Sequence, residues 1–419
     1  MAKRNFKIAI VGGGAAGITV AALLRRLCNT IGGDEIVIVE PSEIHYYQPA
    51  LTLVGGGVSS ITSIRKPTSA LIPKSVFWLQ DWADEFFPKE SRLKLRSGDT
   101  IEYEYLVVCP GLEVKWDAIP GLSESLGKHG VCSNYSPSGA VYTWECVQAL
   151  SSGNKSVFTQ PAMPIKCPGA PQKIAYLVAD YLRRNGIRSE CEVHFVTQSA
   201  SIFGVPFYAK ELVKIAADHA IVVDYGTNLV AVDGPSRSAK FEIVEGEKKG
   251  ETFVLDFDLL HVTPPQGAPA FVAQSELANA TGLVEVDKGS LQHVRYPNVF
   301  ALGDVASTPN SKTAAAIRKQ APVVARNIDS MYRSGVVQEH FYDGYASCPL
   351  TTAYGKVLLA EFIYGGKPAP TLPLDPARER RINWWIKKDF LPSFYWHYML
   401  KGYERFPRHD TNFVETGKV

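Results

Sequence analysis

Short apolar runs alternate with amphipathic stretches along most of the chain. The run FKIAIV at residues 6–11 is followed by the glycine-rich break GGGAAG, by helical spacing of apolar residues over 18–29, and by the apolar run EIVIVE at 35–40. Short apolar runs bounded by turn residues predict buried strands, and the helical spacing predicts an amphipathic helix. The first forty residues therefore predict strand, turn, helix and strand, which is the start of a parallel α/β sheet.

A second alternation of the same kind begins with the apolar run KSVFTQP at residues 155–161. It is followed by KIAYLVADYLRRNG at 173–186, which predicts a helix that stops at glycine, and by CEVHFVTQ at 191–198, which predicts the next strand. Between the two units, residues 75–112 predict an antiparallel excursion that returns to the parallel sheet. The pattern therefore predicts an α/β fold with two Rossmann-like units.

Composition excludes several classes of protein. A length of 419 residues with 46% hydrophobic content is enough for two or three domains with full cores, and the net charge of +2 gives no indication of a nucleic-acid partner. The seven cysteines contain no CxxC pair, so we expect no metal site. The chain reaches its first strand by about residue 6 and has no long apolar run, so we expect no signal peptide, no transit peptide and no membrane-spanning helix in this chain.

The first glycine-rich break has the spacing of a dinucleotide-binding loop. It follows a predicted strand and opens a predicted helix, and Glu40 ends the next strand. The first glycine permits a tight turn, the second lets the backbone approach a pyrophosphate, the third lets helix pack on strand, and a carboxylate in this place accepts hydrogen bonds from a ribose. An ordinary glycine turn is the alternative. The candidate residues of the loop are Gly12, Gly14, Ala15, Ala16 and Gly17.

Two later segments favour FAD over NAD as the dinucleotide. The run VFALGD ends in Gly303 and Asp304, and it resembles the second flavin motif of the two-dinucleotide-binding flavoproteins, in which the aspartate binds the ribityl chain. The run YLVVCPG ends in Gly111 and resembles the middle motif of the same superfamily, with Cys109 and Pro110 in place of the usual small residues. FAD is therefore the expected cofactor.

The second unit lacks the glycine loop that a nicotinamide nucleotide needs. Between its strand and its helix stands PAMPIKCPGAPQK, in which Gly169 is the only glycine and the prolines remove backbone donors. No cradle of amides for a pyrophosphate can form there, so NAD(P)H is an improbable reductant. The loop is free to present Cys167 to the flavin instead.

The chain closely resembles the sulfide:quinone oxidoreductases, particularly the type that includes the mitochondrial enzyme. The matching phrases extend over most of the chain. They are HYYQPALTLVGGG, PIKCPGAPQK, LLHVTPP, RYPNVFALGD, SKTAAA, YDGYASCPL and LPSFYWHYMLKGY.

The resemblance implies a redox centre made of two cysteines. Cys167 and Cys348 would form a disulfide, or a sulfur-bridged version of one, against the flavin. Hydrosulfide would attack it as in thiol exchange. Cys348 would then carry the persulfide, and Cys167 would be the thiolate that reacts with FAD. A membrane quinone, with ubiquinone favoured, would take the electrons, and glutathione, sulfite or a second sulfide would remove the sulfur.

The resemblance also assigns further cofactor contacts. Gln48 and Ala83 match cofactor-contacting positions of the family. Lys312, at the start of a predicted helix, could stabilise charge on the reduced flavin, and a solvated lysine is the alternative. Cys132 lies in the region where another branch of the family uses a third cysteine, and its surroundings look like the two-cysteine branch.

The C-terminal segment combines aromatic and basic residues. Residues 384–406 hold nine aromatic side chains, and 377–409 contain eight Lys or Arg against three Asp or Glu. This composition predicts an interfacial membrane anchor, with Pro392 dividing it into two helices, and burial in a core or a dimer contact is the alternative. We therefore expect a peripheral, monotopic protein of a bacterial cytoplasmic membrane or the mitochondrial inner membrane; the sequence leaves open whether it forms a homo-oligomer.

Together these features predict the organisation of the chain. Residues 1–135 and 259–340 would form an FAD-binding domain in two parts, 136–258 a second Rossmann-like domain, and 341–419 a C-terminal membrane-associating region. The expected function is sulfide:quinone oxidoreductase. Two rivals are a type II NADH:quinone oxidoreductase, which should carry a second glycine loop, and a flavin-bearing interaction protein without turnover.

Overall fold

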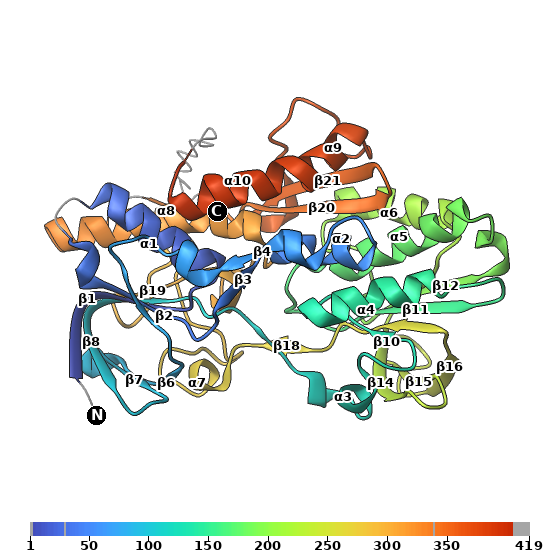
Figure 1. The fold of residues 1–419 in the computed structure, drawn as a ribbon, viewed down its shortest axis with the longest axis horizontal. Coiled ribbons are helices and arrows are strands. Elements are labelled where there is room, and N and C mark those ends of the chain that lie inside the picture. The colour runs from blue at the N-terminus through green and yellow to red at the C-terminus, as the bar shows by residue number, and fades with distance from the viewer. Residues whose placement is uncertain (1–2, 29–30, 338–339, 405–419) are drawn as a thin grey trace.

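The first apolar runs of the chain form one twisted sheet at the left of Figure 1. In the computed structural model, which describes residues 3–28, 31–337 and 340–404, its strand order is β5-β2-β1-β8-β7-β6, and β19 pairs with β8. The pairs of β1, β2, β5, β8 and β19 are parallel, and β6 and β7 form the antiparallel excursion that the sequence predicts. Its strands are β1 (Lys3–Val11), β2 (Ile36–Val39), β5 (Phe77–Leu79), β6 (Ala83–Phe87), β7 (Arg92–Leu95), β8 (Thr100–Val108) and β19 (Val299–Ala301).

Both faces of this sheet are covered, which is why β1 ends in an unbroken run of four buried apolar residues. Ile8 and Ile10 belong to the buried cluster on the face that helices α1 (Ala15–Leu27) and α8 (Ala314–Ser334) cover. Ala9 and Val11 point to the opposite face and pack in a separate buried cluster. Helix α8 begins after Thr313, whose hydroxyl accepts a hydrogen bond from the amide of Ala316.

The second alternating unit forms a parallel sheet of its own, with the strand order β10-β17-β11-β12-β13. Helix α5 (Ala170–Arg184) begins directly after the proline-rich loop and packs on this sheet, and a three-stranded antiparallel sheet lies beside it. The strands of both sheets are β10 (Val131–Cys132), β11 (Lys155–Gln160), β12 (Glu192–Thr197), β13 (Val222–Asp224), β17 (Leu259–His261), β14 (Thr227–Asp233), β15 (Ser238–Ile243) and β16 (Thr252–Asp256).

The two units are joined by two chain crossings that run side by side. There, β9 (Glu113–Val114) pairs with β18 (Gln266–Gly267), and β18 is seen between the units in Figure 1. Strands β10 and β17 also pair with each other. The second sheet therefore includes residues on both sides of 136–258, the range expected for the second Rossmann-like domain. Sequence could not place these boundaries, because strands of two and three residues carry no periodic pattern.

The C-terminal region lies across both units and is coloured red in Figure 1. Its antiparallel strands are β20 (Ala346–Ala353), β21 (Lys356–Ile363) and β22 (Lys367–Pro368), and β20 lies against α5. Three helical segments follow without interruption. They are α9 (Arg381–Trp385), a π-helical turn (Ile386–Phe390) and α10 (Leu391–His397).

The expected division of this segment at Pro392 is wrong. A proline ring clashes with the carbonyl group of the preceding turn in a regular α-helix, but here Pro392 stands in the first turn of α10, after a wider π-helical turn. The helical path therefore continues through the proline. Within the described residues, none of the helices is both long enough and apolar enough to span a bilayer.

The remaining elements are short or cover the outer faces. The other helices are α2 (Leu51–Gly55), α3 (Leu122–Ser125), α4 (Pro137–Gln148), α6 (Pro206–Asp218) and α7 (Ala270–Ala273), and the other strands are β3 (Ile44–Tyr46) and β4 (Arg65–Pro67). The 3-10 turns are Gly33–Glu35, Gln48–Ala50, Ile61–Ile64, Thr68–Ala70, Pro88–Glu90, Trp116–Ala118, Arg188–Glu190, Gly303–Val305, Tyr364–Gly366 and Met399–Lys401.

Candidate active site

The glycine-rich loop after β1 packs against the middle flavin segment. Gly12 has a φ of +104°, and a Cβ there would lie 2.5 Å from the carbonyl oxygen of Cys109. A Cβ on Gly17 would lie 1.9 Å from the carbonyl oxygen of Gly12, so only glycine lets α1 approach this turn. At Gly14 a Cβ would meet nothing within 4 Å, which leaves open space in front of the N-terminus of α1. This arrangement fits a pyrophosphate.

The other predicted flavin segment lies beside the same loop. Gly303 has a φ of +76°, and its Cβ would lie 3.6 Å from the Cβ of Ala16. Glu40 accepts hydrogen bonds from the amide nitrogens of Gly13 at 2.7 Å and Ser42 at 2.8 Å, and burial raises the pKa of its carboxyl group. The fold thus brings the first, middle and last flavin segments together.

The remaining predicted cofactor residues lie at separate places around this centre. Gln48 is exposed at the start of a 3-10 turn, and Ala83 is buried at the start of edge strand β6. Ala15 begins α1, and Gly111 follows β8 with a φ of +79° and open space where a Cβ would be. Two buried polar atoms near the cysteine loop have no hydrogen-bond partner among the described residues, the Nε2 of Gln266 and the Oγ1 of Thr308. Unpaired buried polar atoms in such a place fit a bound polar cofactor.

Cys167 and Cys348 come together from positions 181 residues apart. Cys167 lies in the loop between β11 and α5, and Cys348 lies on β20, which packs against α5. Their sulfur atoms are 3.8 Å apart, and Cys348 is 1% exposed. A Cβ on Gly169 would lie 2.6 Å from the sulfur of Cys348, so the only glycine of the loop is the residue that lets the two cysteines approach.

Backbone contacts hold Cys167 in an unusual conformation. Its φ is +48°, which is rare for a residue other than glycine and indicates local strain at this position. Its amide nitrogen donates to the carbonyl oxygen of Lys312 at 2.8 Å, and the amide of Lys166 donates to the Oε1 of Gln266 at 2.9 Å. The hydroxyl of Tyr135 donates to the carbonyl oxygen of Lys166 at 3.0 Å. The cysteine loop is therefore tied to the flavin half of the molecule.

The charges around the pair make the two cysteines unequal. The thiol of Cys348 donates a hydrogen bond to Cys167, and the Nζ of Lys173 donates to the same sulfur at 3.0 Å. These contacts hold the pKa of Cys167 well below its usual range, in spite of burial. The hydrogen bond that it donates and its own burial raise the pKa of Cys348. Cys167 is therefore the thiolate of the pair.

Two more buried lysines surround this centre. Lys387, in the π-helical turn, donates to the carbonyl oxygen of Pro349 at 2.8 Å, and burial lowers its pKa to about 7. Lys312 donates to the carbonyl oxygens of Ala306 at 2.6 Å and Thr308 at 3.0 Å, and burial lowers its pKa to about 8. Because Lys312 is 5% exposed, the alternative of a solvated lysine is wrong.

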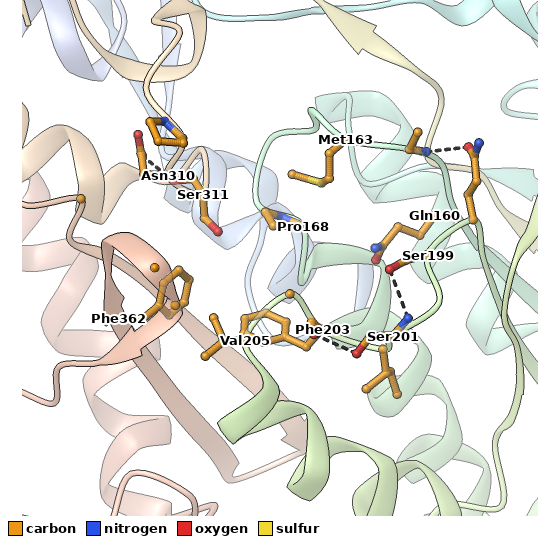
Figure 2. Close-up of a pocket in the computed structure, with 18 of the residues that line it drawn as sticks. Gln160, Met163, Pro168, Ser199, Ser201, Phe203, Val205, Asn310, Ser311 and Phe362 are labelled. Carbon is orange, nitrogen blue, oxygen red and sulfur yellow. Dashed lines mark hydrogen bonds between the residues drawn. The ribbon is translucent and has the colours of Figure 1, made fainter. Parts of the chain in front are cut away.

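A cavity of about 530 Å³ opens beside the cysteine loop, at the ends of β11 and β12. In Figure 2, Met163 and Pro168 of the loop face it, with Asn310 and Ser311 on one side and Phe203 and Phe362 below. The lining is mainly amide, hydroxyl and apolar, with Glu245 as its one charged residue among those described. The cavity therefore suits a small polar molecule.

The C-terminal segment divides its aromatic side chains between core and surface. Phe394, Tyr395 and Trp396 are buried, so for these three side chains the alternative of burial in a core holds. Trp385 is 51% exposed and Tyr403 is 43% exposed. The predicted aromatic Phe406 lies outside the described residues.

Sequence reasoning missed Lys173 and Lys387 as site residues. Lys173 ends the motif PIKCPGAPQK, but Lys387 gave no signal beyond the basic charge of its segment.

The five cysteines outside the active-site pair are all buried. Cys28, Cys109 and Cys191 belong to the same buried cluster of the core. Among the described residues, no three His, Cys, Asp or Glu side chains are placed to hold a metal ion. Burial raises the pKa of the Cys132 thiol.

Comparisons with known proteins found relatives in sequence and in fold. The family model for pyridine nucleotide-disulphide oxidoreductases matches residues 6–138. The chain is 46% identical over 401 residues to the mitochondrial sulfide:quinone oxidoreductase of Dictyostelium discoideum, covering 96% of this chain and 87% of that protein, and 41% identical to the enzyme of the same name from Mus musculus, covering 96% and 88%. The solved structure of sulfide:quinone oxidoreductase from Aquifex aeolicus has the same fold, with a TM-score of 0.76 at 21% identity, covering 96% of this chain and 92% of that one.

Proposed function

The chain belongs to the sulfide:quinone oxidoreductase family and is an FAD-dependent enzyme, and on that premise we propose that it oxidises hydrogen sulfide to sulfane sulfur at Cys167 and Cys348. Electrons leave through FAD to a membrane quinone, with ubiquinone favoured. The observation that carries the proposal is the 3.8 Å separation of the two sulfur atoms next to a cation.

The proposed reaction begins from the disulfide of the two cysteines. Hydrosulfide attacks the sulfur of Cys348, a new S–S bond forms there, the bond to Cys167 breaks, and Cys167 leaves as a thiolate. The sulfide sulfur is thereby oxidised to sulfane sulfur, and the disulfide accepts the electron pair. A small sulfur acceptor would then take the outer sulfur of the persulfide and leave Cys348 as a thiol, and FAD, when bound, would supply the two-electron oxidant that re-forms the disulfide.

The residues of this chain explain why the bond breaks in that direction. Cys167 is the better leaving group, since a thiol of lower pKa leaves faster and Lys173 stabilises its negative charge at 3.0 Å. Lys387 provides a second buried positive charge near the pair when it is protonated, which favours entry of the hydrosulfide anion. Gly169 keeps the path between the sulfur atoms open.

We place the cofactor over the three flavin segments. Gly12, Gly14, Ala15, Ala16 and Gly17 would hold the pyrophosphate, and Glu40 would accept from the ribose. Burial raises the pKa of Asp304, and the positive charges of Lys166 and Lys312 act in the opposite direction. Asp304 would bind the ribityl chain. The buried cation of Lys312 would stabilise charge on the reduced ring. Gln48, Ala83 and Gly111 are proposed as further contacts.

The cavity beside Pro168 is the proposed site for the small sulfur acceptor, which is glutathione, sulfite or a second sulfide. Its lining includes Met163 and Pro168 of the cysteine loop, so an acceptor bound there would lie beside that loop. The exposed side chains of Ile382, Trp385 and Tyr403, with the basic residues around them, are proposed to rest on a membrane surface. The proposed membrane is the mitochondrial inner membrane or a bacterial cytoplasmic membrane, and two of the relatives are named as mitochondrial enzymes.

The proposed domains of the chain follow the two parallel sheets. An FAD-binding domain in two parts, near 1–135 and 259–340, would flank a second Rossmann-like domain near 136–258, and 341–419 would form the membrane-associating region. The sheets move both inner boundaries by a few residues, because β10 and β17 join the second unit.

Anaerobic mixing of the purified FAD-loaded enzyme with sulfide, and separately with NADH, tests the function. The proposal predicts that sulfide bleaches the flavin absorbance and that NADH does not, because no second glycine loop is present. Bleaching by NADH without any response to sulfide would identify the rival NADH:quinone oxidoreductase. No response to either reductant would favour a flavin-bearing interaction protein.

A further inference from the structure

The C-terminal helix α10 is hydrogen-bonded, through one histidine, to the loop proposed for the pyrophosphate of FAD. Tyr395 of α10 and His45 of β3 are both buried, at 4% and 7% exposed. The hydroxyl oxygen of Tyr395 lies 2.6 Å from the Nε2 of His45, and the Nδ1 of the same ring lies 3.4 Å from the carbonyl oxygen of Gly13. One imidazole therefore connects a helix near the end of the chain to the middle of the glycine-rich loop.

The directions of these two hydrogen bonds follow from the charge of the ring. Burial lowers the pKa of His45 to about 4, so at physiological pH the imidazole is neutral and carries a single N–H group. A carbonyl oxygen can only accept, so the proton is on Nδ1, which donates to Gly13. Nε2 then accepts from the hydroxyl of Tyr395, whose pKa burial raises well above its usual range. Tyr395 therefore selects the tautomer of His45 that holds Gly13.

These contacts fix the peptide groups on both sides of Gly13. Its amide nitrogen donates to the Oε2 of Glu40 at 2.7 Å, and its carbonyl oxygen accepts from His45. The peptide group between Gly13 and Gly14 is trans, so its carbonyl and its N–H point in opposite directions. The bond from His45 thus turns the amide of Gly14 to the opposite side. Gly14 caps the N-terminus of α1, where backbone amides bind phosphate groups.

The residues that follow Tyr395 are bonded to the two helices of the flavin unit. The Nε of Arg26, in the last turn of α1, donates to the carbonyl oxygen of Lys401 at 2.6 Å. Arg326 of α8 donates to both carboxylate oxygens of Glu404, at 2.6 and 2.7 Å. The C-terminal segment is therefore held at both ends of α1, at the glycine-rich loop through His45 and at the last turn through Arg26, which limits the movement of Tyr395.

We propose that Tyr395 and His45 are positioning residues for FAD, which hold the glycine-rich loop in the conformation that binds the pyrophosphate. This inference rests on the proposed place of FAD at that loop. Without the hydroxyl of Tyr395, the ring of His45 can rotate or change its tautomer, the carbonyl group of Gly13 loses its donor, and FAD leaves faster. The C-terminal segment, part of which is proposed to rest on a membrane, thereby also retains the cofactor.

The rate of FAD release from the full-length FAD-loaded enzyme tests the inference without sulfide or quinone. Release is followed by the rise in flavin fluorescence after dilution, at a temperature where circular dichroism shows a folded chain. Tyr395→Phe keeps the ring, whose centroid is 4.8 Å from that of Tyr47, and should release FAD about 2- to 10-fold faster than wild type, as expected for the loss of one hydrogen bond. Tyr176→Phe is the matched control and should release FAD at the wild-type rate. It also removes a buried tyrosine hydroxyl, which donates to the carbonyl oxygen of Leu212 in the second unit at 3.2 Å.

Two further variants separate a positioning role from a general loss of stability. The double variant of Tyr395→Phe with His45→Phe should release FAD no faster than His45→Phe alone, because Tyr395 acts through His45. Full additivity, or equal release rates in Tyr395→Phe and Tyr176→Phe, would overturn the inference; the second comparison remains decisive if His45→Phe does not fold. Glu40→Gln tests the place of FAD itself. An unchanged rate in Glu40→Gln would overturn the proposed cofactor position, whereas faster release there with a wild-type rate in Tyr395→Phe would overturn this inference alone.

Discussion

Replacing Lys173 with methionine should reduce the thiolate population of Cys167. The side chain is 3% exposed, and its Nζ lies 3.0 Å from the sulfur, so methionine keeps most of the buried volume and removes only the charge and its hydrogen bond. Burial disfavours the charged lysine, but the negative charge on Cys167 more than offsets it, so the pKa of Lys173 is raised and it is a cation in the wild type.

The size of the effect follows from the geometry. Two unit charges 3.0 Å apart attract each other by about 5.5 kcal/mol at an effective dielectric constant of about 20, and the cost of removing both ions from water offsets part of this. Measured hydrogen bonds to charged groups contribute about 1.5–3 kcal/mol. Since about 1.4 kcal/mol is tenfold, the thiolate of Cys167 should be about 10- to 150-fold less populated in Lys173→Met at a pH where the thiol is mostly protonated.

The assay is alkylation of the dithiothreitol-reduced enzyme with iodoacetamide over a range of pH, with the peptide containing Cys167 quantified by mass spectrometry. In Lys173→Met the rise in alkylation rate should move to higher pH, and sulfide-dependent flavin bleaching should slow. Lys214→Met is the control, because Lys214 is an exposed lysine that pairs with Glu211. Identical pH profiles for Lys173→Met and wild type would refute the assignment of Lys173 as the cation that stabilises Cys167.

Three other predictions concern the glycine of the cysteine loop, the buried lysine of the π-helical turn and two exposed side chains of the C-terminal segment. Gly169→Ala should slow sulfide-dependent bleaching at least about tenfold, because its Cβ would lie 2.6 Å from the sulfur of Cys348. Bleaching at the wild-type rate would show that the loop accommodates the added Cβ without moving the two cysteines out of place. Burial lowers the pKa of Lys387 from 10.5 to about 7, so the folded protein binds fewer protons than the unfolded chain between these values and stability rises with pH there. In urea unfolding, the stability of Lys387→Met relative to wild type should therefore fall steadily from pH 7 towards pH 10, and a constant difference would contradict the assigned burial. Replacing the exposed pair Ile382 and Trp385 with serine should reduce co-sedimentation with anionic vesicles and leave bleaching by sulfide unchanged; undiminished sedimentation would remove these two side chains from the membrane surface.

The parts of the site that the sequence predicts are those that depend on local backbone geometry. Gly12 and Gly17 are required by contacts within one turn and its neighbouring strand, so their spacing carries the information by itself. The switch of β6 and β7 to antiparallel pairing was also visible, because it follows from turn residues and alternation within about thirty residues.

The parts that the sequence could not predict depend on packing between distant segments. Cys167 and Cys348 are 181 residues apart, and only resemblance to a family paired them. Lys387 stands among basic residues that we expected at a lipid surface, yet its π-helical turn directs it inward against β20. Phe394, Tyr395 and Trp396 likewise count as surface aromatics by composition and are buried in the structure. Which side of a helix faces the core is decided by its partners, and the sequence of that helix alone does not contain them.

Electrons from sulfide are proposed to enter the protein through Cys167 and Cys348. The most direct test is stopped-flow anaerobic mixing of sulfide with FAD-loaded wild type, Cys167→Ser, Cys348→Ser and the control Cys191→Ser. We expect rapid bleaching of the flavin in wild type and in the control, and loss of bleaching in both active-site variants. Bleaching of either active-site variant at the wild-type rate would contradict the proposal.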